Sequence, residues 1–416
     1  MTEKSFIPLG DGFFHQLADK KRVFAAAAQK AENAGREDVL RAIGKSVLDE
    51  DDFVLLTSPA ASRELEALAE RALSETLRRF GRAKQLFAPL YLSNYCTNSC
   101  VYCGFHAGPG IKRKALSPDE IETELKALAA TGLRQVLLLT GDAPKRTGGS
   151  YIALAVDMAA RYFPTVGIEV PALTLEEYAQ IAKAGAGSMT MFQETYDQRL
   201  YARLHPAGPK RVFANRLDAP HRALMAGIRQ VNFGVLLGLG DWRFDVFMMA
   251  AHARFLQRMF PEAETAFSLP RLRPIGERKN GGDENGRVFV PSPVKDRDFV
   301  QALTALRCFV PQAGITLSTR ESAFMRDRLL PLGVTKISAG VCTGVGGYAQ
   351  PAPEKTVQFF IDDERSVDEM RDSLGKLGFQ PVFSDWLLPE KGELPLSQAL
   401  RRSLGDLGHH KSRAPF

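Results

Sequence analysis

Short apolar runs alternate with longer amphipathic segments along most of the chain, and this alternation predicts the fold class. The segments at 118–130 and 175–184 repeat apolar residues at helical spacing and end near glycines. Near-continuous apolar strands that alternate with helices form parallel sheets that are buried on both faces. Eight such runs predict an α/β fold, a (β/α)8 TIM-type barrel, with an open doubly wound sheet as the alternative. The predicted strands are residues 89–93, 135–140, 166–170, 188–192, 230–237, 265–269, 315–319 and 335–338.

The same pattern divides the chain into three parts. The first part predicts an N-terminal helical extension, because 63–80 is amphipathic and 21–35 is rich in alanine. The second holds the barrel, and the third is a C-terminal segment that we expect to cap it. The stretch at 278–293 is rich in Gly, Asn and charge and predicts a long surface loop or lid, and the basic tail from residue 408 predicts a frayed end. The three parts are residues 1–85, 86–348 and 349–416.

Composition and charge narrow the class of protein. The 416 residues are 45% hydrophobic and 25% charged, which is typical of a globular protein. The net charge of +6 is mild for this length and forms no basic stripe, so we expect no nucleic-acid partner. No apolar run approaches the roughly 20 residues of a membrane span, and the first residues show no apolar secretory core. We therefore expect a cytoplasmic protein without a membrane partner.

The cysteines indicate a metal site. Three of the five cysteines, Cys96, Cys100 and Cys103, fall within eight positions after the first predicted strand, on the face where barrel loops form active sites. Thiolates suit iron–sulfur clusters and zinc. Structural zinc sites and electron-transfer clusters ordinarily use four protein ligands, and no fourth cysteine lies nearby. We expect ordinary packing roles for Cys308, on an apolar helical face, and for Cys342, in a Gly-rich loop.

Three cysteine ligands leave one iron of a [4Fe-4S] cluster without a protein ligand. That iron can bind the amino and carboxylate groups of S-adenosylmethionine. The C-x3-C-x2-C spacing, with the aromatic Tyr102 before the third cysteine, resembles the signature of the radical S-adenosylmethionine superfamily. The resemblance implies that the cluster passes one electron to the sulfonium and that a 5′-deoxyadenosyl radical results.

Residues after other predicted strands suggest further contacts with S-adenosylmethionine. Asp142 follows strand two, where the superfamily usually has a glutamate that holds the methionine amino group. Glu169 ends strand three, where a carboxylate can meet the ribose or the substrate. Arg216, on the helix after strand four, is a candidate partner for the methionine carboxylate. Gly238 ends strand five in a fragment that resembles the adenine-contacting strand of the superfamily.

Arginines follow two of the last strands. Arg271 and Arg273 lie beside prolines after strand six, and they suit the capture of a substrate carboxylate because guanidinium groups bind carboxylates bidentately. Arg320 and Glu321 follow strand seven, and a salt bridge between these two, or solvation of their loop, is the ordinary interpretation. All these motifs follow strands, so we expect them at one end of the barrel.

As a set, the motifs are similar to those of the 2-iminoacetate synthases, the tyrosine lyases of bacterial thiamine biosynthesis. The resemblance implies a radical S-adenosylmethionine lyase that cleaves the Cα–Cβ bond of L-tyrosine to 2-iminoacetate (dehydroglycine) and p-cresol. In such an enzyme Arg271 would bind the tyrosine carboxylate, with Ser268 and Tyr91 in the pocket. A thiazole synthase is the implied partner, and a flavodoxin or ferredoxin the implied reductant. The motifs are Pro-Leu-Tyr-Leu-Ser-Asn-x-Cys, Gln-Glu-Thr-Tyr, Gly-Leu-x-Asp-Trp-Arg, Pro-Arg-Leu-Arg-Pro, Ser-Thr-Arg-Glu-Ser and Gly-Gly-Tyr.

Three alternatives stay open at this point. The tyrosine lyase of [FeFe]-hydrogenase maturation shares the barrel chemistry but carries further cysteines, and no cysteine follows Cys342 here. A tryptophan lyase would differ only in its substrate pocket. A non-catalytic metal-binding scaffold is the third, and the intact triad disfavours it. The sequence departs from the family pattern at Asp142, where glutamate is more usual, and at Cys342, where a small polar residue is more usual.

Overall fold

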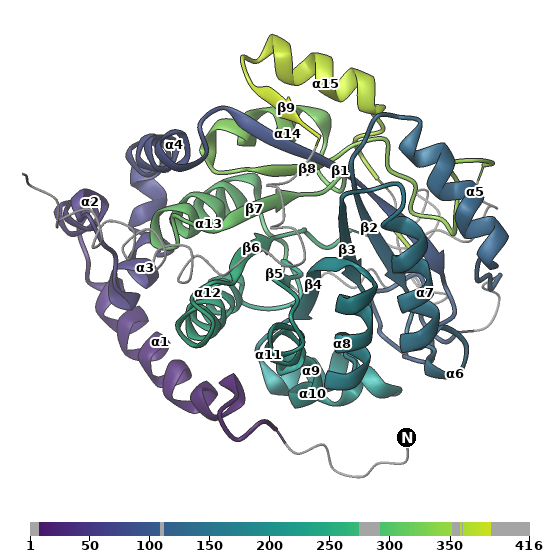
Figure 1. Ribbon diagram of the computed structural model, residues 1–416. Coiled ribbons are helices and arrows are strands. Elements are labelled where there is room, and N and C mark those ends of the chain that lie inside the picture. The colour runs from purple at the N-terminus through teal and green to yellow at the C-terminus, as the bar shows by residue number, and fades with distance from the viewer. Residues whose placement is uncertain (1–7, 109–111, 274–291, 352–357, 360, 384–416) are drawn as a thin grey trace, which may run out of the picture. The chain divides into compact units, whose positions relative to one another are not determined.

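Eight parallel strands close into a barrel. β1 pairs with β2 on one side and with β8 on the other, so the sheet has no free edge within the ring. Figure 1 shows this ring with helices around its outside. Closure confirms the TIM-type barrel and excludes the open doubly wound sheet. The strands are β1 (Ala83–Ser93), β2 (Gln135–Thr140), β3 (Thr165–Glu169), β4 (Ala186–Glu194), β5 (Gln230–Val235), β6 (Glu264–Ser268), β7 (Gly314–Leu317) and β8 (Lys336–Ser338).

The structure is a computed structural model, and its described residues all belong to one compact unit that ends at residue 384. The residues described are 8–108, 112–273, 292–351, 358–359 and 361–383. Helices after the strands form the outer layer of the barrel. They are α5 (Pro118–Ala129), α6 (Pro144–Thr147), α7 (Gly149–Ala159), α8 (Leu175–Ala184), α9 (Gln198–Leu204), α10 (Phe213–Leu217), α11 (Ala219–Met225), α12 (Trp242–Met259), α13 (Asp296–Phe309) and α14 (Ala323–Leu329).

Local sequence signals fix several of these helix ends. Ser117 caps α5 through a hydrogen bond from the Glu120 N–H, and Glu120 accepts in return from the Ser117 N–H at 2.8 Å. This reciprocal pair satisfies two N–H groups that the first turn of a helix leaves free. At the other end of α8, Gly185 takes a φ of 121°, a conformation that side chains disfavour. The predicted segments 118–130 and 175–184 therefore match α5 and α8 closely.

The predicted N-terminal extension is helical and packs on the outer layer of the barrel. The helices α1 and α3 contact α12, and α4 contacts α13. Aromatic stacking contributes to this interface, because the rings of Phe53 on α3 and Phe309 on α13 lie 4.5 Å apart. Cys308 is buried in the same layer, as expected of a small apolar residue. The helices of the extension are α1 (Leu17–Glu32), α2 (Arg36–Gly44), α3 (Glu50–Leu56) and α4 (Leu65–Phe80).

The boundary predicted at residue 85 falls inside a strand, because β1 already begins at Ala83. The apolar run that begins at Pro89 covers only the second half of β1. Its first half carries polar residues, among them Lys84, which is buried. The first residues of the strand therefore show neither alternating polarity nor a continuous apolar run, and the sequence does not predict where the strand begins.

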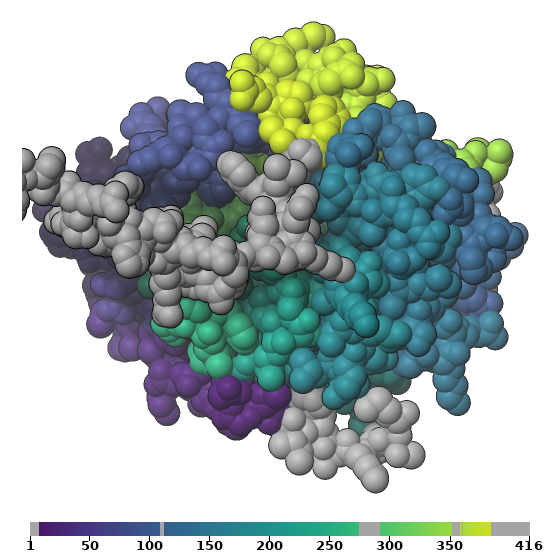
Figure 2. All heavy atoms as spheres, in the orientation of Figure 1, coloured from purple at the N-terminus to yellow at the C-terminus, as the bar shows by residue number. Residues whose placement is uncertain are grey.

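The C-terminal segment adds one strand to the barrel that the sequence did not predict. β9 (Gln380–Val382) pairs in parallel with the start of β1, and α15 (Val367–Lys376) precedes it. Figure 2 shows these residues, in yellow, lying against the rest of the unit. The predicted loop at 278–293 lies outside the described residues except for its last two positions, and the predicted tail from residue 408 lies wholly outside them. Along the described part of the chain, no helix has the length and apolarity of a membrane span.

Candidate active site

A cavity occupies the inside of the barrel. The interior of a TIM barrel is ordinarily filled with layers of branched apolar side chains. Here all eight strands contribute lining residues, and many of these are small or polar, such as Gly167, Ser188 and Asn232. Because such side chains leave the space unfilled, the cavity extends from polar residues near the strand starts to the loops that follow the strands. Those loops carry the cysteine triad.

The three cysteines lie in the loop after β1 as free thiols. Backbone hydrogen bonds join this loop to the end of α9 and to the residues after it. They run from the Val101 N–H to the Leu204 carbonyl at 3.2 Å and from the Ser99 N–H to the Ala207 carbonyl at 3.1 Å. Cys103 lines the cavity. Burial, and then the nearby Cys100 thiol, raises the pKa of Cys103 to about 11. A metal bound here would supply the positive charge that favours the thiolate of Cys103.

The donor set of the triad fits an iron–sulfur cluster better than a single metal ion. In the described part of the chain, no three His, Cys, Asp or Glu side chains converge closely enough to hold one ion. A four-iron cluster asks for a different arrangement, because each thiolate binds a separate iron and the thiolates stand further apart. The thiols of Cys96 and Cys103 pack against Tyr91, Phe105 and Leu139, so the site is walled by apolar and aromatic groups.

Asn98, in the middle of the triad loop, connects three parts of the site. Its side chain is 2% exposed. It donates to the Asp142 carboxylate at 2.8 Å and accepts from the Lys210 N–H at 2.8 Å. Burial raises the pKa of Asp142, and the hydrogen bond from Asn98 opposes that shift. The predicted cofactor residue Asp142 therefore lies against the cysteine loop and outside the set of residues that line the cavity.

The half-buried Tyr102 and the buried His205 form a pair beside the triad. The Tyr102 hydroxyl and His205 Nε2 lie 2.6 Å apart, and His205 Nδ1 lies 2.8 Å from the Tyr201 carbonyl oxygen. A carbonyl can only accept, so Nδ1 carries the proton and Tyr102 donates to Nε2. Burial, and then the charge of Lys210, lowers the pKa of His205 to about 3, so the ring is neutral. The pair fixes the Tyr102 ring on the cavity wall.

Glu194 ends β4 in an unusual backbone conformation at the cavity wall. It has a φ of 71°, which is uncommon for a residue with a side chain and which concentrates at functional sites. Its carboxylate accepts from Lys210 Nζ at 2.6 Å, and both side chains line the cavity. Asp245 on α12 holds the following turn, because it accepts from the Tyr196 N–H at 2.7 Å and the Thr195 hydroxyl at 2.9 Å.

Three further predicted residues lie on the cavity wall. Burial, and then the charge of Glu194, raises the pKa of Glu169 to about 7, so this carboxyl can both hold and release a proton near neutral pH. Ser268 accepts a hydrogen bond from the Asn232 amide at 2.9 Å. Tyr91 also lines the cavity, and its hydroxyl donates to Gln358 at 2.8 Å. Through this hydrogen bond to Gln358, the C-terminal segment contributes a residue to the site.

The arginines after β6 and β7 lie differently from what the sequence suggested. Arg271 pairs with Glu321 and, at 2.6 Å, with Asp296, and it lies outside the cavity lining. The expected salt bridge between Arg320 and Glu321 is wrong, because Glu321 pairs with Arg271 and Arg273. Arg320 instead lines the cavity, with its guanidinium 3.5 Å from the centre of the Phe359 ring. Burial lowers the pKa of Arg320, and the nearby acidic groups oppose that shift.

Two other predicted cofactor residues also lie outside the cavity lining. Arg216 is close behind the wall, where its Nε donates to the Phe192 carbonyl at 2.6 Å. Gly238 has a φ of 108° and faces Leu272. Both stay predictions as ligands of S-adenosylmethionine. The pair Gln358 and Phe359 extends the family likeness along the sequence, but we expected no site role for these two residues or for Lys210, since none follows a predicted strand directly.

The family comparisons agree with this geometry. Residues 90–249 match the family described as the radical SAM superfamily, and residues 268–380 match the biotin and thiamin synthesis associated domain. HydG from Carboxydothermus hydrogenoformans, described as an FeFe-hydrogenase maturase, superposes with a TM-score of 0.81 at 31% identity over 90% of this chain and 85% of that chain. The closed barrel and the cysteine triad define a radical S-adenosylmethionine enzyme, in which the family implies an iron–sulfur cluster.

Curated relatives narrow the family further. The 2-iminoacetate synthase of Escherichia coli (strain K12) is 40% identical over 350 residues, which cover 84% of this chain and 90% of that protein. The 2-iminoacetate synthase of Salmonella typhimurium is 38% identical over the same shares of both chains. The chain belongs to the 2-iminoacetate synthase family of lyases.

Proposed function

We propose that this enzyme cleaves the Cα–Cβ bond of L-tyrosine to give 2-iminoacetate and p-cresol, for use in thiazole formation. One observation carries the proposal: Cys103 and a cation suited to an amino acid carboxylate, Arg320, line the same cavity. Membership of the 2-iminoacetate synthase family supports the product. We further propose a [4Fe-4S] cluster on Cys96, Cys100 and Cys103, with S-adenosylmethionine as the second cofactor.

The residues of the cavity suggest how the substrate is held. The Arg320 guanidinium can form two parallel hydrogen bonds to the tyrosine carboxylate. Arg271 stays a candidate for this role, but its guanidinium already pairs with two carboxylates. Glu169 can accept a proton from the substrate ammonium group, because its pKa of about 7 matches that transfer. Ser268 and Tyr91 offer hydroxyl groups to the rest of the substrate.

When bound, the iron–sulfur cluster supplies the electron that cleaves S-adenosylmethionine and so provides a radical that abstracts hydrogen from the substrate amino group. Apolar residues pack against Cys96 and Cys103, and the buried His205 holds the half-buried Tyr102 beside them. The overall conversion of tyrosine and S-adenosylmethionine to 2-iminoacetate, p-cresol, 5′-deoxyadenosine and methionine consumes two electrons and one proton. We propose a flavodoxin or ferredoxin as the electron source and a thiazole synthase as the acceptor of 2-iminoacetate.

An anaerobic product assay tests the function. Protein reconstituted with iron and sulfide is mixed with S-adenosylmethionine, dithionite and L-tyrosine, and the products are identified by mass spectrometry. We expect 5′-deoxyadenosine and p-cresol to appear together. 5′-Deoxyadenosine without p-cresol would leave the class intact but reject tyrosine, and L-tryptophan is the substrate to test in that case. Neither product from protein with a verified cluster would favour a non-catalytic scaffold.

A matched pair of variants tests the carboxylate site. Arg320→Gln should raise the KM for tyrosine by about 10- to 150-fold, which corresponds to the roughly 1.5–3 kcal/mol of hydrogen bonding to a charged group. Arg271→Gln should lower thermal stability, because it leaves Glu321 buried with less neutralisation. A large KM effect in Arg271→Gln with none in Arg320→Gln would assign the carboxylate to Arg271 instead.

A further inference from the structure

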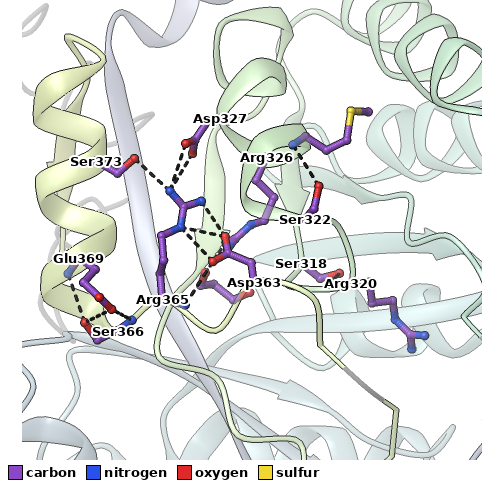
Figure 3. Close-up of polar contacts among 12 residues, drawn as sticks. Ser318, Arg320, Ser322, Arg326, Asp327, Asp363, Arg365, Ser366, Glu369 and Ser373 are labelled. Carbon is purple, nitrogen blue, oxygen red and sulfur yellow. Dashed lines mark hydrogen bonds and ion pairs between the residues drawn. The ribbon is translucent and has the colours of Figure 1, made fainter. Parts of the chain in front are cut away.

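A cluster of ion pairs lies beside the active-site mouth but outside the cavity lining. Asp363 pairs with Arg326 of α14 and, at 2.6 Å, with Arg365, and Arg365 reaches Asp327 at 3.0 Å. Figure 3 shows Asp363 between the two arginines. The side chains of Arg326 and Asp363 are 2% and 1% exposed. Burial raises the pKa of Asp363, but the two arginines outweigh that effect and hold it below its usual value.

This cluster fastens the C-terminal segment to the loop that carries Arg320. The backbone N–H groups of Asp362 and Asp363 both donate to the Thr319 carbonyl, at 2.8 and 3.3 Å. Arg326 also donates to the Ser338 carbonyl at the end of β8. Residues 361–366 are therefore joined to the loop after β7 by backbone hydrogen bonds and to the end of β8 through Asp363 and Arg326. Thr319 directly precedes Arg320 in the chain.

The same segment places two side chains in the cavity. Phe359 lies against the Arg320 guanidinium, and Gln358 accepts from the Tyr91 hydroxyl, so both contact residues that we assign to substrate binding. The backbone of this pair is held as well, because the Gln358 N–H donates to the Thr343 carbonyl at 3.1 Å and the Thr343 hydroxyl donates to the Phe359 carbonyl at 2.9 Å. We call residues 358–359 and 361–366 the strap.

A contribution to folding stability does not by itself explain why the chain carries these buried ion pairs. Removing charges from water costs several kcal/mol for each ion, and well-packed apolar residues often stabilise a protein as much as a buried ion pair does. A buried ion pair does, however, favour one geometry strongly, because each charge must meet its partner. The strap needs that property, since Gln358 and Phe359 must meet Tyr91 and Arg320 at hydrogen-bonding and stacking distance.

We propose that Arg326, Asp363 and Arg365 are positioning residues for the reaction: their ion pairs hold the strap on Thr319, so that Gln358 and Phe359 complete the tyrosine pocket over Arg320. This inference rests on the proposed function and adds residues that act through the strap without touching the substrate. When the strap is held only part of the time, the apparent affinity for tyrosine falls in proportion to the fraction of molecules with a complete pocket.

Arg365→Gln tests the proposal. This side chain is 18% exposed, and its loss leaves the Arg326–Asp363 pair in place, so the variant retains the most buried part of the cluster. Arg371→Gln is the matched control, because it removes the same charge from α15 and, among the described residues, breaks only the pairs of Arg371 with the exposed Asp368 and Asp372. Arg365→Lys, which keeps the charge, serves as the conservative variant. Asp363→Asn is the stronger perturbation if it folds.

Two measurements are made on each variant. Hydrogen–deuterium exchange of residues 361–366 needs no cluster and reports directly on the strap. Product formation gives kcat and KM for tyrosine. We expect Arg365→Gln to speed exchange in the strap and to raise the KM for tyrosine about tenfold, as follows if the complete pocket falls to about a tenth of the molecules. Arg371→Gln should change neither, and Arg365→Lys should recover most of the affinity.

The outcomes separate the two proposals. Faster exchange with an unchanged KM would show that the cluster only stabilises the segment, and it would overturn the positioning role. Unchanged exchange in both Arg365→Gln and Asp363→Asn would overturn it as well. If the wild-type enzyme forms no p-cresol, the proposed function fails and the inference fails with it. If the wild type forms p-cresol and the variants keep its KM, only the inference is wrong.

Discussion

Replacing Asp245 by asparagine should change how the stability of this enzyme depends on pH. Asp245 is 3% exposed and holds the turn after Glu194 through hydrogen bonds from Thr195 and Tyr196. Burial raises the pKa of its carboxyl to about 7, from 3.8, although those two hydrogen bonds lower it. Asparagine offers the same acceptor oxygen without a charge. The variant therefore preserves the turn and removes the titration.

The sign and size of the effect follow from proton linkage. Between about pH 4 and pH 7 the folded protein holds a proton on Asp245 that the unfolded chain has lost, so the wild type loses stability as the pH rises through this window. Each pH unit costs about 1.4 kcal/mol, so the loss from pH 5 to pH 8 is about 2.5 kcal/mol. For 416 residues the entropy of unfolding is about 0.9 kcal/mol/K, which converts this loss to about 3 °C in Tm.

Thermal unfolding of the cluster-free protein at pH 5, 6, 7 and 8 measures this effect by circular dichroism. Relative to the wild type, Asp245→Asn should gain about 3 °C in Tm between pH 5 and pH 8, whatever its absolute Tm. That comparison cancels titrations common to both proteins and any cost of burying the new amide. Asp157→Asn, at a side chain that is 57% exposed, is the control and should show no such trend. A Tm difference between Asp245→Asn and wild type that is constant with pH would refute the assignment of a raised pKa to Asp245.

Three other substitutions, with Gly187→Ala as a control, probe the cysteine loop and the start of β1. Asn98→Ala removes the hydrogen-bond partner of the Asp142 carboxylate, so stability should fall by about 2–4 kcal/mol and iron incorporation should drop; wild-type iron content and Tm would contradict this role. Gly208→Ala should also lower the free energy of unfolding by about 2–4 kcal/mol, because Gly208 has a φ of 91° and a new Cβ would lie 2.6 Å from the Asn98 Cα. Gly187→Ala is the control, because a Cβ there meets no atom within 4 Å and should be tolerated. Burial, and then the charge of Arg307, lowers the pKa of Lys84 to about 7. Between about pH 7 and pH 10 the unfolded chain therefore binds a proton that the folded protein has lost, and the wild type gains stability as the pH rises. Lys84→Met should lack this gain. Denaturation curves from pH 7 to pH 10 test the last point, and parallel pH dependences of the two proteins would argue against it.

Much of the barrel could be predicted because its signals are local. Each predicted strand overlaps one observed strand, since near-continuous apolar runs between amphipathic helices have few other folds open to them. The cysteine triad was also readable, because its ligands lie in one loop and their spacing reports the chemistry directly. Short elements with little apolar content gave no such signal. β9 and the first half of β1 escaped prediction for that reason.

The arginines and the strap show where sequence stops being informative. The sequence by itself determined the barrel, the triad and the family motifs, because these depend on periodicity and on spacing within one loop. Whether Arg271 or Arg320 faces the cavity was decided only by tertiary structure: Arg271 pairs with Glu321 and lies outside the lining, whereas Arg320 lies within it. The hydrogen bond between Tyr91 and Gln358, which lie 267 positions apart in the chain, likewise depends on the tertiary structure. The direction of a side chain and its contacts with distant residues depend on the whole folded chain, so local sequence patterns do not predict them.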